Sequence, residues 1–201
     1  MFWAIGESPL VVGRLRWYND CMVENSKKEV AANAAAEAVP ATRAERLIPF
    51  GVMAIVLLLD QITKRIVEAR LDLYEVWAPI PAIEPFFRIL HTTNTGMAFG
   101  LFQQGGPIFA AFAFVVTAGI IYFNHTLPGD ERLIRIALGL QLGGVLGNLI
   151  DRLRQGHVTD FLDFGPWPLF NVADTALVAG VILMGFAILT EGRRKGTNVP
   201  A

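Results

Sequence analysis

Carboxylate and amide side chains gather at the ends of long apolar runs in this chain. Asp60 lies four residues before Lys64 in DQITK, the first of five short polar blocks. The other four blocks are NTGMAFG with Asn94, GGVLGNLIDR with Asn148, Asp151 and Arg152, HVTDFLDF with Asp160, and FNVAD with Asn171 and Asp174. Buried or membrane-edge carboxylates are costly unless they are paired, so this set is a candidate functional site.

Two carboxyl groups that share a low-dielectric pocket cannot both ionise cheaply, so one keeps its proton. The ionised carboxylate can then take a proton from water while the protonated partner polarises a carbonyl group. The sequence offers no rival chemistry: Cys21 is the only cysteine, and zinc-ligand spacing and a Gly-x-Ser-x-Gly motif are missing. These residues permit peptide hydrolysis, but they do not indicate which two aspartates act.

Structural interpretations exist for several of the same residues. Asp60 and Lys64 could form an ordinary ion pair along one helix face. Asp151 and Arg152 could be interfacial residues, and Asp174 could be a plain helix N-cap. We expect Asp163, the second carboxylate of HVTDFLDF, to be a solvated loop residue.

Composition indicates where such a site would lie. The 201 residues are 53% apolar and 17% charged, and ordinary soluble domains are about 25% charged. The 17 basic and 18 acidic residues nearly cancel, which argues against a nucleic-acid partner. These values exclude intrinsic disorder and leave two classes, a protein with a large buried core and a protein that lives in a bilayer.

Four long apolar runs predict four membrane spans, at about 47–63, 107–123, 133–150 and 172–190. With its flanks, each run is long enough to cross about 30 Å of hydrocarbon. Between the first two spans, the β-rich stretches 75–80 and 86–92 are punctuated by prolines. The predicted fold is therefore a mainly α membrane protein, with four transmembrane helices and a small β cradle between spans 1 and 2. The glycines of the third span should allow close helix packing.

The two ends of the chain differ from residues 47–190, the predicted four-span domain. Residues 1–46 carry many charges and are expected to be a poorly ordered extension, in which 31–39 could be helical. Residues 191–201 form a basic tail. Four spans place both termini on one side, and the distribution of Lys and Arg leans towards the cytoplasmic side.

The five blocks resemble, in order and spacing, those of the lipoprotein signal peptidase (signal peptidase II) family. The resemblance covers about 47–190 and implies an aspartic endopeptidase of the bacterial inner membrane that needs no metal or cofactor. It implies removal of signal peptides from prolipoproteins, with the cut just before a diacylglyceryl-modified cysteine. The partners would be these substrates and membrane lipids, the active site would be extracytoplasmic, and both termini would be cytoplasmic.

The resemblance also assigns roles by motif position. Its catalytic pair falls on Asp160 and Asp174. Residues that line the substrate pocket or support the pair are Asn94, Asn148, Arg152, Asn171 and Ala173. Structural positions are Asp60, Lys64, Gly96, Gly144 and Asp151. Thr159 stands where the family often has valine, a nearly isosteric change.

Two other classes of protein could carry a similar set of residues. A small proton-coupled transporter would place its charges near the bilayer midplane and show internal repeats, whereas these groups lie at span ends and no repeat is visible. An assembly factor without catalytic activity would not require two aspartates in one pocket. Cleavage of a lipid-modified prolipoprotein, but not of its unlipidated form, separates both classes from a peptidase.

Overall fold

The computed structural model describes residues 22–29, 40–95 and 106–196, and the chain divides into two units, Met1–Pro40 and Ala41–Ala201. In the first unit, residues 22–29 are helical, and Lys28 pairs with Glu24 at 2.7 Å. The helix expected at 31–39 lies outside the described residues. The poorly ordered extension expected over 1–46 stays a prediction.

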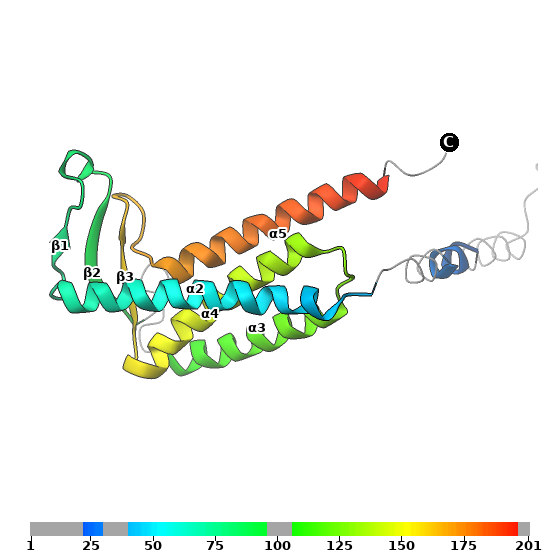
Figure 1. The fold of residues 1–201 in the computed structure, drawn as a ribbon, viewed down its shortest axis with the longest axis horizontal. Coiled ribbons are helices and arrows are strands. Elements are labelled where there is room, and N and C mark those ends of the chain that lie inside the picture. The colour runs from blue at the N-terminus through cyan, green and yellow to red at the C-terminus, as the bar shows by residue number, and fades with distance from the viewer. Residues whose placement is uncertain (1–21, 30–39, 96–105, 197–201) are drawn as a thin grey trace, which may run out of the picture. The chain divides into compact units, whose positions relative to one another are not determined.

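Four long helices make up most of the second unit: α2 (Arg43–Arg70), α3 (Gly106–Thr126), α4 (Arg132–Gln155) and α5 (Val172–Gly196). All four are long and apolar enough to cross a membrane, which confirms the predicted fold class. They lie side by side, with a small sheet at one end (Figure 1).

The helices extend beyond the predicted spans, and α2 differs most. It begins at Arg43, where Thr42 and Glu45 form a capping box, and it continues to Arg70. The sequence suggested an end near Thr63 because charged residues follow. Lys64 is fully buried and Glu68 is mostly buried, so these charges face protein and the helix continues past them.

The sheet has three antiparallel strands in the order β1 (Val76–Trp77), β2 (Arg88–Asn94) and β3 (Val158–Asp163). A 3₁₀ turn at Pro81–Ile83 lies between β1 and β2. The first two strands come from the predicted cradle between spans 1 and 2. The third comes from the segment after α4, which the sequence suggested to be a loop, so the sheet joins two distant parts of the chain.

Helix α4 lies at the centre of the bundle and packs against α2, α3 and α5. Its glycines allow this, as predicted. A Cβ atom at Gly143 would lie 2.6 Å from the Cβ of Val56 in α2. One at Gly144 would collide with the backbone oxygen of Ala173 in α5. These contacts require glycine and bring three helices together beside the polar blocks.

The outer faces of α2, α3 and α5 are apolar and exposed, while most of the apolar stretch of α4 is buried. Ile55, Val115 and Val181, one from each outer helix, are all at least 60% exposed. Large exposed apolar surface on a soluble monomer is unusual. A bilayer would cover these faces, in agreement with the predicted spans.

Candidate active site

Asp160 is carried by the middle of β3, where it pairs with Thr92 of β2. The residue is 3% exposed, and its carboxyl group accepts two hydrogen bonds from side-chain amides. The Nδ2 of Asn94, at the end of β2, donates to Oδ2 at 2.9 Å, and the Nδ2 of Asn171 donates to Oδ1 at 2.7 Å. The neighbouring strand and the start of α5 therefore fix both oxygens.

Asp174 is carried by the first turn of α5. Asn171 precedes this helix, and its Oδ1 accepts a bond from the backbone N–H of Asp174 at 3.0 Å. The backbone N–H of Asn171 donates in return to Oδ2 of Asp174 at 3.3 Å. The pair is a reciprocal cap in which Asn171 holds the capping position, so Asp174 is not the N-cap itself. Its other oxygen, Oδ1, accepts a 2.7 Å bond from Nδ2 of Asn148 in α4.

The side chain of Asn171 connects Asp160 to Asp174. The amide of Asn171 donates its N–H to Asp160, and its oxygen accepts from the backbone of Asp174. Burial and the charge of Asp174 together raise the pKa of Asp160 to about 6, although the bonds from Asn94 and Asn171 oppose the shift. A buried carboxyl with a like charge beside it favours the protonated form, so this pair suits proton transfer.

A buried ion cluster of Asp60, Lys64 and Asp151 lies beside the two carboxyl groups and is bonded to Asn148. Lys64 is fully buried, and its Nζ lies 2.9 Å from Oδ2 of Asp60 and 2.8 Å from Oδ2 of Asp151. It also donates to Oδ1 of Asn148 at 3.0 Å. That bond fixes the amide of Asn148, so that its N–H points at Asp174. Asp60 and Lys64 are therefore more than a surface pair: they connect α2 to both α4 and α5.

Ala173 and two glycines let these helices approach. The backbone N–H of Ala173 donates to Oδ1 of Asp60 at 2.9 Å, and Ala173 is fully buried. A Cβ at Gly147 would lie 2.6 Å from Oδ2 of Asp60, so only glycine leaves room for that carboxylate. Gly144 gives the same room to the backbone of Ala173.

Arg152 lies on the same face of α4, one turn after Asn148. Its Nη1 donates to the backbone oxygen of Asn148 at 3.3 Å, and its guanidinium lies 5.3 Å from the ring centre of Phe109 in α3. A cation at this distance from an aromatic face is attracted to it. Arg152 thus brings positive charge to the edge of the site.

The described part of the site contains all the residues expected there except Gly96, which lies outside the described residues. The expectation for Asp163 was wrong. Asp163 ends β3, is 5% exposed, and accepts two bonds from Arg88 at 2.7 and 2.9 Å. It is a buried structural carboxylate of the sheet, because Arg88 comes from the paired strand.

Sequence reasoning missed Gln61. Its Nε2 donates to Asp60 at 3.2 Å, to Asp151 at 3.0 Å and to the backbone oxygen of Gly147 at 3.3 Å, so it bridges the two carboxylates that hold Lys64. Its place inside DQITK, directly after Asp60, was the available signal. In the described residues, no group of His, Cys, Asp and Glu could hold a metal ion.

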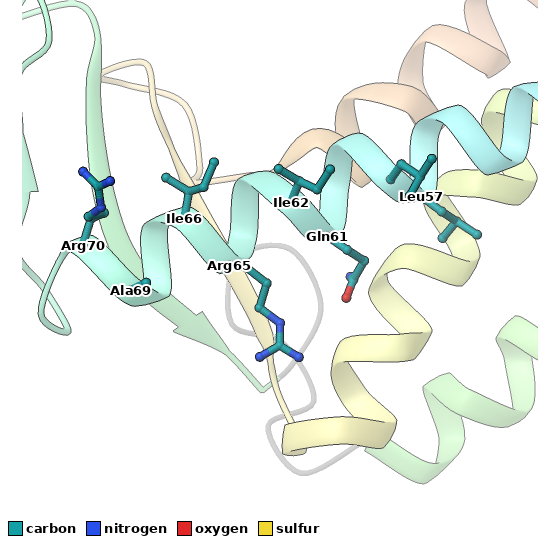
Figure 2. Close-up of a pocket in the computed structure, with 8 residues that line it drawn as sticks. Leu57, Gln61, Ile62, Arg65, Ile66, Ala69 and Arg70 are labelled. Carbon is teal, nitrogen blue, oxygen red and sulfur yellow. The ribbon is translucent and has the colours of Figure 1, made fainter.

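A shallow hollow on the surface has neither Asp160 nor Asp174 in its lining. Figure 2 shows that its lining comes from α2 alone. The lining residues are Leu57, Leu58, Gln61, Ile62, Arg65, Ile66, Ala69 and Arg70. A surface formed by one helix does not enclose a ligand, so the hollow is part of the outer face of the bundle.

Known proteins resemble this chain over the same region. A family model described as signal peptidase (SPase) II matches residues 52–190. A lipoprotein signal peptidase of Moorella thermoacetica is 40% identical over 150 residues, which are 74% of this chain and 98% of that protein. One of Shouchella clausii is 42% identical over 145 residues, which are 72% and 94% of the two chains.

A solved structure described as a bacterial membrane enzyme superposes with a TM-score of 0.71 and 26% identity, over 82% of this chain and 99% of that chain. A second, described in the same way, has a TM-score of 0.65 and 27% identity. The family match spans four helices that fit a membrane and the buried aspartates between them. This chain therefore belongs to the signal peptidase II family and is a membrane peptidase.

Proposed function

We propose that this chain removes signal peptides from prolipoproteins in the bacterial inner membrane, and that it cuts just before a diacylglyceryl-modified cysteine. Membership of the signal peptidase II family and the names of its relatives support this substrate class. The aspartic chemistry is supported by one observation above all: Asn171 bonds to the carboxyl of Asp160, which is buried, and to the backbone of Asp174, which is partly buried.

In the proposed mechanism, Asp160 and Asp174 form the catalytic dyad and share one proton. The ionised carboxylate accepts a proton from a water molecule, whose oxygen attacks the scissile carbonyl carbon. The protonated carboxyl donates a hydrogen bond to the carbonyl oxygen as negative charge develops there. The leaving amine nitrogen then takes a proton from the dyad, and the C–N bond breaks.

The amides would keep the dyad in position for this reaction. Asn94 and Asn171 fix the carboxyl of Asp160, and Asn148 fixes that of Asp174. Lys64, held by Asp60 and Asp151, orients the amide of Asn148. Catalytic groups whose rotamers are fixed by neighbouring bonds need no reorganisation during the reaction. The mechanism uses carboxyls and water, so a metal chelator should leave the activity unaltered.

Arg152 would line the substrate pocket beside the dyad, and the fully buried Ala173 would support the dyad through its bond to Asp60. The sheet at this end of the bundle carries exposed aromatic side chains, including Trp77, Phe86 and Trp167. Aromatic residues are enriched where a membrane meets water. They support a substrate whose peptide lies at the membrane surface while its acyl chains remain in lipid.

We further propose that the dyad faces the extracytoplasmic side and that both termini are cytoplasmic. The sheet, which carries Asp160, and the start of α5, which carries Asp174, lie at one end of the helices, and α2 begins at the other end (Figure 1). A reporter fused after Lys195 should therefore read as cytoplasmic, and one inserted near residue 105 as extracytoplasmic. The reverse result would place the dyad on the wrong side for exported lipoproteins.

The test of the proposed function compares two substrates. Purified protein in detergent is given a prolipoprotein with the diacylglyceryl cysteine and the same prolipoprotein without the lipid. We expect cleavage of the first alone, before the modified cysteine, as seen by mass spectrometry of the products. Equal cleavage of both would contradict the lipid requirement, and no cleavage of either would contradict the substrate class.

A further inference from the structure

Thr159, which directly precedes Asp160, is fully buried and bonded through its hydroxyl to two helices. The hydroxyl donates to Oε1 of Glu68 in α2 at 2.7 Å. It accepts a bond from Nε2 of Gln155 in α4 at 3.0 Å. The hydroxyl therefore uses its donor and one of its two acceptor lone pairs, and both bonds go to side chains of other elements.

Glu68 is itself held firmly. Arg154, near the end of α4, donates to its two oxygens at 2.8 and 3.2 Å. Its side chain is only 20% exposed. A hydrogen bond to an ionised carboxylate is shorter and stronger than one between neutral groups. The hydroxyl of Thr159 thus ties β3 to a point where the ends of α2 and α4 are already joined.

The backbone of Thr159 connects to the site as well. Its N–H donates to Oδ2 of Asp151 at 3.4 Å, and its oxygen accepts from Nδ2 of Asn171 at 3.4 Å. These two bonds are long. The side-chain bonds at 2.7 and 3.0 Å are the shorter connections between this residue and the helices.

Successive residues of a strand point to opposite faces. Thr159 makes its side-chain bonds to α2 and α4, and Asp160 makes its own to Asn94 and Asn171. A shift of the strand at Thr159 is therefore passed directly to Asp160. Valine at this position would keep the shape of the side chain, but it would leave Glu68 and Gln155 facing a methyl group.

We propose that Thr159 is a positioning residue for Asp160. Its hydroxyl, bound to Glu68 and Gln155, fixes β3 relative to α2 and α4, so that the carboxyl of Asp160 lies within hydrogen-bond distance of Asn94 and Asn171. This inference rests on the proposed role of Asp160 in catalysis.

The experiment compares Thr159→Val with Thr159→Ser in the full chain, with a diacylglyceryl-modified prolipoprotein as substrate. We expect Thr159→Val to lower kcat by about 10- to 100-fold with little change in KM, because a displacement of about 1 Å at a reacting group costs rate and not affinity. Thr159→Ser keeps the hydroxyl and should retain most of the activity. Thr190→Val is the matched control, since its hydroxyl bonds only to its own helix at Phe186 and Ala187.

The pH profile separates positioning from simple loss of stability. The bonds from Asn94 and Asn171 lower the pKa of Asp160, so looser bonds in Thr159→Val should move the acid limb of kcat/KM to higher pH. A variant that only folds less well would lose folded enzyme and keep the limb where it is. That result, or unaltered kcat per folded molecule, would overturn the inference.

Glu68→Leu tests the same clamp from the other side, because leucine has no oxygen to accept the hydroxyl, and it guards against poor folding of Thr159→Val. If the hydroxyl acts through Glu68, the two substitutions together should cost little more than the larger single effect. Effects that multiply would contradict the clamp. Asp160→Asn is measured in parallel: activity in that variant refutes the proposed dyad, whereas an inactive Asp160→Asn beside a normal Thr159→Val refutes only the role of Thr159.

Discussion

Two buried polar regions, one at each end of the helices, differ in the charge that they contain. At the end away from the sheet, Arg135 is fully buried and donates to backbone oxygens of Asn124, Leu127 and Pro128, at 3.0, 2.8 and 3.1 Å, and to the side chain of Asn124. Its hydrogen-bond partners are uncharged oxygens at the end of α3 and in the turn after it, and Glu131, which is also buried, balances its charge. A cation that binds carbonyl groups in this way holds a loop in place.

The dyad end contains more negative than positive charge. Four carboxyl groups, of Asp60, Asp151, Asp160 and Asp174, lie there with two cations, Lys64 and Arg152. Lys64 is bonded to the first two carboxyls, and the dyad is bonded by amides. An arrangement chosen for stability alone would pair each buried charge. The unbalanced region is the one where chemistry is expected, and the neutral region only holds the fold.

The largest effect should come from the dyad. Asp160→Asn and Asp174→Asn should each lower kcat by about 10²- to 10⁴-fold or more, because an amide can neither take a proton from water nor share one. Removal of a buried carboxylate should leave the fold intact. Single-turnover cleavage, normalised to folded protein, measures this. Substantial turnover in either variant would contradict the claim that the carboxyls at the sheet end carry the chemistry.

Lys64→Met should be the most destabilising single change. It leaves the carboxyls of Asp60 and Asp151 buried without their cation, at a cost of about 3–5 kcal/mol. It also frees the amide of Asn148, so the folded fraction should cleave slowly. Thermal unfolding in detergent, followed by cleavage per folded molecule, separates the two effects. A stable and fully active variant would show that the cluster does not support the dyad.

Arg135→Met should affect stability without affecting catalysis. The loss of its donors leaves backbone oxygens of the α3–α4 turn without partners, at about 1–3 kcal/mol. At a temperature where the variant is folded, its kcat should equal that of the unaltered protein. Reduced kcat in folded Arg135→Met would mean that the neutral region also contributes to the reaction, and the division between the two ends would be wrong.

The smallest effect should be that of Asp163→Asn, the control closest to Asp160. The neutral amide weakens the bonds from Arg88, whose side chain is 38% exposed, and should cost about 1 kcal/mol. Cleavage should persist, because Asp163 bonds to the sheet and not to the dyad. Loss of activity comparable to that of Asp160→Asn would assign Asp163 a role that its bonds do not suggest.

The sequence was enough to predict the four helices, the β-rich segment after the first span, and the glycine contacts of α4. It could also identify the polar blocks, because carboxylates beside apolar runs stand out. It could not reveal that Asn171 caps α5 while its amide reaches Asp160. An asparagine that only caps a helix and one that also bonds to a second element look alike in a sequence. Asp163 was misjudged for a related reason: its partner, Arg88, lies 75 residues earlier and meets it only through strand pairing.

Glu68 and Gln61 illustrate the limit of helical patterns. On α2, Gln61 directly follows Asp60, and the charged Glu68 lies one turn after Lys64. Charges of this kind ordinarily mark the end of a membrane span. The two residues continue a polar face toward the protein because α4 and β3 supply their partners: Asp151 for Gln61, and Arg154 and Thr159 for Glu68. Such partners depend on tertiary packing and leave no local signal.

The most direct test of the account is the titration of Asp160 in two proteins, by ¹³C NMR of labelled aspartate carboxyls, with Asp160→Asn used to assign its signal. Burial and the charge of Asp174 raise the pKa of Asp160 to about 6. Asp174→Asn removes that repulsion, so the pKa of Asp160 should fall towards its ordinary value. A pKa of Asp160 that is the same in both proteins would contradict the claim that the two carboxyls share one site.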